Sequence, residues 1–142
     1  MPICDAETIE LPARLDQIAV ALEWLEQLAQ QHVWPARTSF GLILSADEAL
    51  TNIVTYAFAD ADEGAHTFLL RCATQPDGVV LQIEDSGGAF DPTASAPEAL
   101  AESVDEAAIG GHGVRLMRHY LRELHYAREQ DRNVLTLGAA LA

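Results

Sequence analysis

The sequence predicts an α+β fold, a two-layer α/β sandwich with helices on one face of a mixed, mostly antiparallel sheet. The first observation is the stretch 41–58, GLILSADEALTNIVTYAF, whose apolar residues recur at spacings of three and four, as expected of a helix lying on a sheet. The second is a pair of β-rich segments, 66–74 and 79–84, joined by the turn sequence QPDG, which predicts a hairpin. We interpret residues 1–142 as one domain, because this length can bury a substantial core.

The other elements follow from the same periodicities. Residues 8–11 are a strand candidate ending at Pro12, and proline suits an edge strand because it donates no hydrogen bond. Apolar residues at helical spacing predict a helix over 13–32, and Pro35 fits the first turn of the next helix. The last third of the chain is expected to contain a helix over 114–124, strands over 123–128 (overlapping the helix end) and 134–137, and a turn at 131–133.

Composition narrows the classes of partner. The net charge is -14 at pH 7, yet 49% of the residues are hydrophobic, so the chain should fold. Such an acidic chain is poorly suited to nucleic acid or to an anionic membrane surface, since both are negatively charged. A basic protein partner suits the charge better, and solubility alone is the simpler explanation. All eight basic residues are arginine, which excludes chemistry that needs a lysine, such as Walker-type phosphate binding.

Neither the cysteines nor the amino terminus indicates export. Cys4 and Cys72 are far apart and match no disulfide framework or metal-ligand spacing. The first residues lack a basic segment followed by an apolar run, and no stretch reaches the roughly 20 apolar residues of a membrane span. We therefore expect a cytoplasmic protein with reduced thiols and no membrane association.

Two polar side chains share one face of the central helix. Glu48 and Asn52 are four residues apart, and residues i and i+4 lie one above the other on a helix. This carboxylate and carboxamide therefore point into the same space, which favours a pocket at that edge. The simpler interpretation is that both are ordinary solvated residues.

A glycine-containing loop follows the second strand of the predicted hairpin. Asp85 and Gly87 belong to the segment 85–92, DSGGAFDP. An aspartate at a strand end can accept a hydrogen bond from an exocyclic amine such as that of adenine, and the glycines allow a close backbone approach. The same sequence also occurs as a plain turn.

A second glycine cluster precedes a predicted helix. Residues 110–113, GGHG, lead into that helix, and the backbone amides at a helix start can bind an anion such as phosphate. Arg115 on the helix can add a charged hydrogen bond. The alternative is that these glycines only form a hinge. The stretch 91–110 before them is typical of a lid or a mobile loop.

The three motifs in this order resemble a known family. ExxxN on a helix, DxGxxFDP after a strand, and GGxG before a helix are similar to the N, G1 and G2 boxes of the GHKL (Bergerat-fold) ATP-binding family. The flanking sequences TNIVTYAF, FDP and NVLTL look like those of the small bacterial anti-sigma-factor serine/threonine-protein kinases, which consist of a histidine-kinase-like ATPase domain. The resemblance covers about residues 7–137 and implies the Bergerat fold, with an ATP lid at about 91–110.

The resemblance also implies a role for each matching residue. Glu48 would be the catalytic base that takes the proton from a partner's serine or threonine hydroxyl, and Asn52 would hold Mg²⁺. Asp85 would accept a hydrogen bond from the adenine amine, Gly87 would let the ring approach, and Thr136 would support adenine through a water. The residues implied to bind ATP are Asn52, Asp85, Gly87, Phe90, Gly111, His112, Gly113, Val114, Arg115 and Thr136.

The sequence departs from the family pattern at several positions. Tyr56 stands where histidine is common, and Ala89 stands where proline is common in DxGxPFDP. His112 and Arg115 occupy positions that are often small or apolar. The stretch 91–110 contains no basic residue, so it offers no cation to the γ-phosphate. These departures concern how tightly ATP is held more than they concern the fold.

The function that the resemblance implies is an Mg-ATP-dependent anti-sigma factor and protein serine/threonine kinase. It would phosphorylate an anti-anti-sigma partner of the STAS class and, in another state, hold a sigma factor. A homodimer is plausible, because the family often pairs. One alternative is a nucleotide-gated switch that sequesters its partner without phosphorylating it. The other is an interaction protein whose glycine loops bind no nucleotide.

Overall fold

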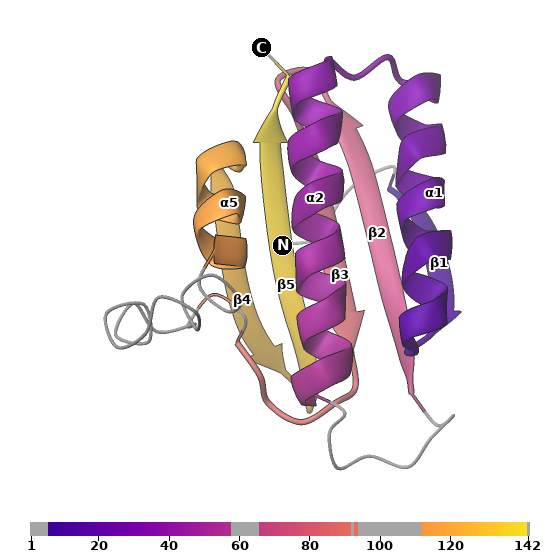
Figure 1. Cartoon of the computed structure of the whole chain (residues 1–142), viewed down its shortest axis with the longest axis vertical. Coiled ribbons are helices and arrows are strands. Elements are labelled where there is room, and N and C mark those ends of the chain that lie inside the picture. Colours follow the sequence, from indigo (N-terminus) through magenta and orange to yellow (C-terminus); the bar gives the residue numbers. More distant parts are fainter. Residues whose placement is uncertain (1–5, 58–65, 92, 94–111, 142) are drawn as a thin grey trace.

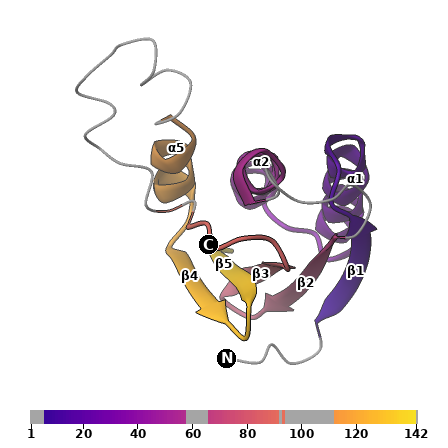
Figure 2. The ribbon, with the colours of Figure 1, turned by 90° about the horizontal axis from the view of Figure 1, so that it is seen from below.

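The part of the chain that the structure describes folds into one sheet of five strands with three α-helices on one of its faces (Figures 1 and 2). The structure is a computed structural model, and it describes residues 6–57, 66–91, 93 and 112–141. In chain order the elements are β1 (Glu7–Pro12), α1 (Leu15–Gln31), α2 (Ala36–Asn52), the π-helical turn η1 (Ile53–Ala57), β2 (Thr67–Gln75), β3 (Gly78–Asp85), α5 (His112–Tyr120), β4 (Glu123–Glu129) and β5 (Arg132–Ala140).

The sheet has the strand order β1-β2-β3-β5-β4, and every pairing among the described strands is antiparallel. The predicted two-layer sandwich is confirmed, and no parallel pair occurs among these strands. The β2–β3 hairpin closes between the paired residues Gln75 and Gly78, as the QPDG sequence predicted. Although α5 and β4 come between β3 and β5 in the chain, β5 pairs with β3 and lies between β3 and β4 in the sheet.

The core lies between the helices and the sheet, because each strand turns alternate side chains toward the helices. Along β3, Leu81, Ile83 and Asp85 are buried, while the residues between them are only partly covered. The apolar stripe of α2 packs onto this face, and burying one large apolar side chain contributes about 1.5–3 kcal/mol. The largest buried side chains of this layer are Leu25, Leu42, Leu50, Phe68, Leu70, Leu81, Ile83, Met117, Leu135 and Leu137.

The central helix is longer than its apolar stripe suggested. α2 begins at Ala36, directly after Pro35, and the Thr38 hydroxyl donates a hydrogen bond to the Ala140 carbonyl at 2.6 Å. The buried Trp34 indole donates to the Thr74 hydroxyl at 2.9 Å. These two bonds fasten the start of α2 to the ends of β5 and β2. None of the helices in the described ranges has both the length and the apolar character of a membrane-spanning helix.

The turn before β5 differs from its predicted position. It lies at Gln130 and Asp131, whose φ angles are 50° and 63°, and not at 131–133. Two successive positive φ angles are the conformation of a two-residue hairpin turn whose twist matches that of the strands. Asn133 is consequently a strand residue, paired with Asp85 of β3.

The predicted overlap of helix and strand at 123–124 is resolved in favour of the strand. α5 ends at Tyr120, and the Arg122 amide already donates to the Gly138 carbonyl at 2.9 Å. Residue 123 therefore opens β4. The backbone after Tyr120 is hydrogen-bonded to β5, so the helix ends earlier than its apolar spacing predicted.

Gly41 lies at a close contact between α2 and α5. A Cβ atom added at Gly41 would be 2.6 Å from the Cβ atom of Tyr120. The Tyr120 ring also packs edge-on against Phe40, with ring centroids 5.4 Å apart, and lies 5.0 Å below the guanidinium of Arg37. Gly41 is thus part of a helix–helix contact, and Ser45, one turn further along α2, is buried as well.

We expect Gly41→Ala to lower the free energy of unfolding by about 1–3 kcal/mol, as is usual for overpacking. The gain in helix propensity, about 1 kcal/mol, opposes this loss but does not remove the clash. Urea denaturation of Gly41→Ala beside the parent protein would measure this loss. An undiminished stability of Gly41→Ala would contradict the close contact between Gly41 and Tyr120.

Candidate functional site

The carboxyl-terminal end of α2 carries the first two candidate residues. Glu48 and Asn52 are both half-exposed, and the Asn52 side-chain amide donates to the Glu48 carboxylate at 3.3 Å. Ala49 and Ile53 beside them are buried on the core side. The predicted shared face is therefore confirmed, and a carboxylate and a carboxamide stand together at this edge of the sandwich.

The helix changes its hydrogen bonding directly after this pair. The sequence predicted a regular helix to residue 58, but the α-helix ends at Asn52 and a π-helical turn, Ile53–Ala57, follows. π-Helical turns are wider than α-helical ones and are frequent at functional sites. The irregular turn thus begins directly after the second of the two candidate residues, Asn52.

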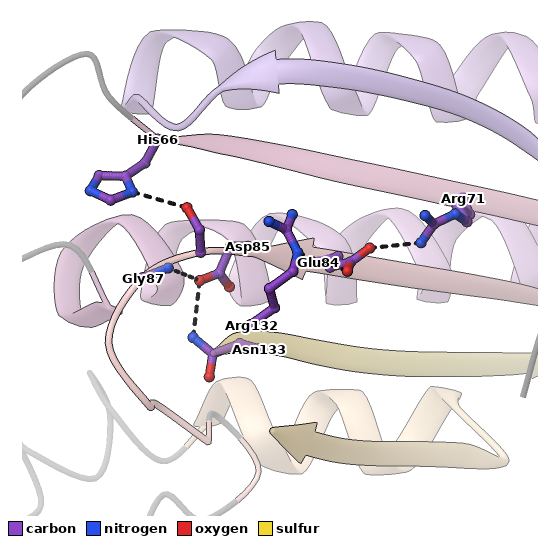
Figure 3. A network of polar contacts seen from close by, with 8 residues as sticks. His66, Arg71, Glu84, Asp85, Gly87, Arg132 and Asn133 are labelled. Atoms are coloured by element: carbon purple, nitrogen blue, oxygen red, sulfur yellow. Dashed lines mark hydrogen bonds and ion pairs between the residues drawn. The ribbon is translucent and has the colours of Figure 1, made fainter. Parts of the chain in front are cut away.

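The end of β3 places Asp85 on the helix-facing side of the sheet, where its side chain is 0% exposed. Its Oδ1 accepts hydrogen bonds from the Gly87 amide at 2.8 Å and from the Asn133 side-chain amide at 2.9 Å (Figure 3). Its Oδ2 is buried and accepts no hydrogen bond from the described residues. A buried polar atom without a partner costs about 1–3 kcal/mol, so a ligand that donates here would relieve a cost already present in the fold.

Burial raises the pKa of Asp85 above its ordinary value of 3.8, because a buried charge loses its hydration. The hydrogen bonds from Asn133 and Gly87 and the charges of Arg128 and Arg132 lower the pKa, but burial outweighs them. The folded protein therefore disfavours the ionised form of Asp85. Such groups concentrate at functional sites.

Asn133 organises the polar groups around Asp85. It is 3% exposed, and its Nδ2 donates both to Asp85 Oδ1 and to the Gly88 carbonyl, the latter at 2.8 Å. Its Oδ1 accepts from the Tyr126 hydroxyl and from Arg128 Nη1, the latter at 3.2 Å. Strands β4 and β5 thereby support the carboxylate of β3.

The loop after β3 is held from several sides. Arg128 Nη1 donates to the Gly87 carbonyl at 2.8 Å. The His66 ring lies 3.0 Å from the Ser86 hydroxyl, as the dashed line at His66 in Figure 3 shows. The Phe90 amide donates to the same asparagine oxygen at 3.3 Å, and its ring packs on the core. The predicted loop residues Gly87 and Phe90 are therefore brought to the Asp85 side of the sheet.

The amino-terminal end of α5 points toward the end of the sandwich where α2 and β3 finish (Figure 1). The helix begins at His112, so His112, Gly113 and Val114 form its first turn, two residues earlier than predicted. Arg115 is exposed on the same helix. Gly111 and, apart from positions 91 and 93, the predicted lid 91–110 lie outside the described residues.

The sequence matches the protein family described as the histidine kinase-like ATPase domain over residues 11–138. The chain belongs to this family. The resemblance drawn from the ExxxN, DxGxxFDP and GGxG motifs is thereby confirmed.

Relatives of this ATPase domain include proteins named as kinases. Serine/threonine-protein kinase BtrW of Bordetella bronchiseptica is 44% identical over 131 residues, which cover 92% of this chain and 91% of that protein. Serine-protein kinase RsbW of Bacillus pumilus is 25% identical over 84% of this chain and 76% of its own. Serine-protein kinase RsbW of Listeria monocytogenes is 26% identical over 80% of this chain and 73% of its own.

Thr136 was predicted to lie near the adenine, but it is on the face of the sheet that points away from the helices. Along β5, Asn133, Leu135 and Leu137 are buried against the helices, so Thr136 faces the opposite side. There its hydroxyl accepts from the Gln82 side-chain amide at 3.4 Å. Thr136 and Asp85 lie on opposite faces of the sheet, and the expected support of adenine by Thr136 is corrected on this ground.

Asn133, Tyr126 and Arg128 were missed by the sequence analysis. The available signal was the two-residue alternation: counting back from the apolar Leu137 and Leu135 places residue 133 on the core face. The prediction of a turn at 131–133 removed Asn133 from the strand. Tyr126 and Arg128 carry no comparable signal, because their role depends on the pairing of β4 with β5.

The outer face of the same strands carries an ion-pair cluster around Glu84. Its two carboxylate oxygens lie 2.8 Å from Arg71 Nη1 and 2.8 Å from Arg132 Nε, and its side chain is 16% exposed (Figure 3). Burial raises the pKa of Glu84, but the hydrogen bonds and charges of the two arginines together lower it below 4.5. Because Glu84 and Arg132 directly precede Asp85 and Asn133, the cluster fastens the same strand ends from the other side.

We expect Glu84→Gln to destabilise the protein at pH 7 by about 1–2 kcal/mol, since a charged acceptor of two hydrogen bonds becomes neutral. A lowered pKa means that the carboxylate contributes stability above its unfolded pKa and loses it as the pH falls through the folded pKa. The difference between variant and parent should therefore shrink as the pH falls below 4.5. Urea denaturation at several pH values would measure it, and a difference that grows on acidification would contradict the cluster.

Proposed function

We propose that the protein binds Mg-ATP where α2 and β3 finish and transfers the γ-phosphoryl group to a serine or threonine of a partner protein. The observation that carries the proposal is the buried Oδ2 of Asp85, which accepts no hydrogen bond from the described residues. The exocyclic amine of adenine supplies the missing donor, and Gly87 leaves room for the ring to approach. Phe90 lies on the same loop with its ring on the core and can border the base.

The residues around the start of α5 are those that we propose bind the phosphates of the nucleotide. Backbone amides at a helix start have no intrahelical acceptor and carry partial positive charge, which suits phosphate oxygens. We assign this role to Gly111, His112, Gly113 and Val114, with Arg115 adding a charged donor. Asn52 offers an amide oxygen of the kind that Mg²⁺ accepts, and the bound ion would neutralise charge on the phosphates.

Glu48 is the residue we assign to the chemical step. It stands half-exposed beside Asn52, with 3.3 Å between the interacting atoms of the two side chains. As the partner's hydroxyl oxygen forms its bond to the γ-phosphorus, the bond from that phosphorus to the bridging oxygen of ADP breaks. Glu48 takes the hydroxyl proton, so ADP and a phosphorylated partner are the products.

The class of partner is taken from the resemblance of the motifs. The names of the relatives, serine/threonine-protein kinase and serine-protein kinase, support only the hydroxyl phosphoacceptor. We therefore propose a partner of the STAS anti-anti-sigma class as the phosphoacceptor, a sigma factor as the second partner, and the cytoplasm as the place of action. The homodimer stays a prediction.

A non-catalytic switch is the second candidate function. The observation that favours it is the absence of any basic residue in the sequence 91–110, which leaves this stretch without a cation for the γ-phosphate. Such a protein would bind ATP and hold its partner without phosphorylating it. Transfer of labelled phosphate to the partner separates the two functions.

We expect Asp85→Asn to change which base binds. The new side-chain oxygen can still accept from Gly87 and Asn133, but an NH₂ group then replaces the free acceptor. The ATP-induced rise in Tm should disappear, and inosine triphosphate, which carries an oxygen at position 6, should bind better than ATP. Equal responses of the variant and the parent to ATP would contradict the assignment of Asp85.

The same variant has a pH signature that needs no nucleotide. A raised pKa means that ionisation of Asp85 opposes folding, so its contribution to stability is lost as the pH rises through the folded pKa. The Tm of Asp85→Asn relative to the parent should therefore increase as the pH rises above 3.8.

We expect Glu48→Gln and Asn52→Ala to separate catalysis from binding. Glu48→Gln should keep an Mg²⁺-dependent rise in Tm with ATP but lower phosphotransfer by about 10²–10⁴-fold, the range for loss of a general base. Asn52→Ala should lose the Mg²⁺-dependent part of the rise. Thermal shifts with and without Mg²⁺, beside a phosphotransfer assay, measure both. Undiminished transfer by Glu48→Gln would remove Glu48 as the base.

A further inference from the structure

We propose that Asn133, held by Tyr126 and Arg128, is the positioning residue that makes this site select a purine with an amino group at position 6. The inference rests on the proposed ATP site and adds to it the group that sets base selectivity. It starts from the side-chain contacts of Asn133. These contacts join the loop motif 85–92 to Tyr126 and Arg128, two residues that lie outside the sequence motifs.

The orientation of the Asn133 carboxamide is determined by its neighbours. Two acceptors, Asp85 Oδ1 and the Gly88 carbonyl, surround Nδ2 at 2.9 and 2.8 Å. Donors from Tyr126 and Arg128, together with one backbone amide, surround Oδ1. Flipping the amide would set NH₂ against those donors and an oxygen against two acceptors, so only one orientation satisfies the site.

This orientation decides which oxygen of Asp85 is available. Oδ1 already accepts from Asn133 and from the Gly87 amide, so both of its lone pairs are used. Oδ2 is left as the single unpartnered acceptor among the described buried side-chain atoms. A ligand therefore meets one acceptor in one fixed direction, which favours an amine over a carbonyl at that point.

Asn133 also keeps a cation away from this carboxylate. Arg128 is near enough for its charge to lower the pKa of Asp85, yet its Nη1 donates to Asn133 Oδ1 and to the Gly87 carbonyl. Without Asn133, Arg128 loses one acceptor and Asp85 loses one donor. A direct ion pair between the two would satisfy both and would occupy the acceptor intended for the base.

The test compares nucleotides that differ only at position 6. Affinities for ATP and for purine riboside triphosphate, which lacks the amino group, are measured by calorimetry with Mg²⁺. The parent protein should favour ATP by about 10- to 100-fold, the value of one hydrogen bond to a charged acceptor. In Asn133→Ala this ratio should fall below about threefold, as in Asp85→Asn, because the acceptor is no longer presented.

A matched control comes from the neighbouring position in β5. Val134 follows Asn133 but faces the other side of the sheet, so Val134→Ala should keep the parent ratio. Asn133→Leu fills more of the space than alanine and serves as the second variant, with the same expected loss. A parent-like ratio in either folded Asn133 variant would overturn the inference. A parent protein that binds neither nucleotide would instead overturn the proposed function.

The unsubstituted protein supplies a readout that requires no variant. Both side-chain amide protons of Asn133 are donated within a buried site, so their exchange with solvent should be slow in ¹⁵N NMR spectra. Both nucleotides should shift these resonances, because both carry a purine ring, but ATP should shift them more, because only ATP donates a hydrogen bond to the carboxylate that they bind. Rapid exchange, or equal shifts with both nucleotides, would overturn the inference.

Discussion

A buried carboxylate and a buried carboxamide, Asp85 and Asn133, face each other at the paired ends of β3 and β5, and the rest of the site is arranged around this contact. A charge in the interior is costly unless it is hydrogen-bonded, and here one oxygen is satisfied and the other is not. The unsatisfied atom is Oδ2 of Asp85. A ligand that donates a hydrogen bond to Oδ2 would remove this cost.

The two faces of the same strand ends carry different kinds of polar group. Asp85 and Asn133 lie under the helices, while Glu84 and Arg132, one residue earlier on each strand, lie on the outer face with Arg71. The outer ion pairs join β2, β3 and β5 at the point where the loop 86–91 leaves the sheet. A site that must hold one acceptor in one direction benefits from strand ends that are fixed on both sides.

The helix layer supplies the polar side chains and the helix end that the proposed site needs for the phosphates and the phosphoacceptor. α2 brings Glu48 and Asn52 to the edge, and its other end is fastened by Thr38, by Trp34 in the preceding turn and by the close contact of Gly41 with Tyr120. α5 directs its amino-terminal end toward the same edge of the sandwich (Figures 1 and 2). The proposed nucleotide therefore has its base beside the sheet and its phosphates beside two helices, an arrangement in which the rigid core positions the base and helix ends meet the charge.

The sequence by itself determined the order of helices and strands, the shared face of Glu48 and Asn52, and the place of Asp85 at a strand end. These features depend on spacings of two, three or four residues within one segment, and such spacings are local. Only the tertiary structure decided that Asn133 faces Asp85, that Thr136 does not, and that Tyr126 and Arg128 take part. Those facts depend on strand register and on the position of one turn, and a shift of one residue moves every side chain of a strand to the other face.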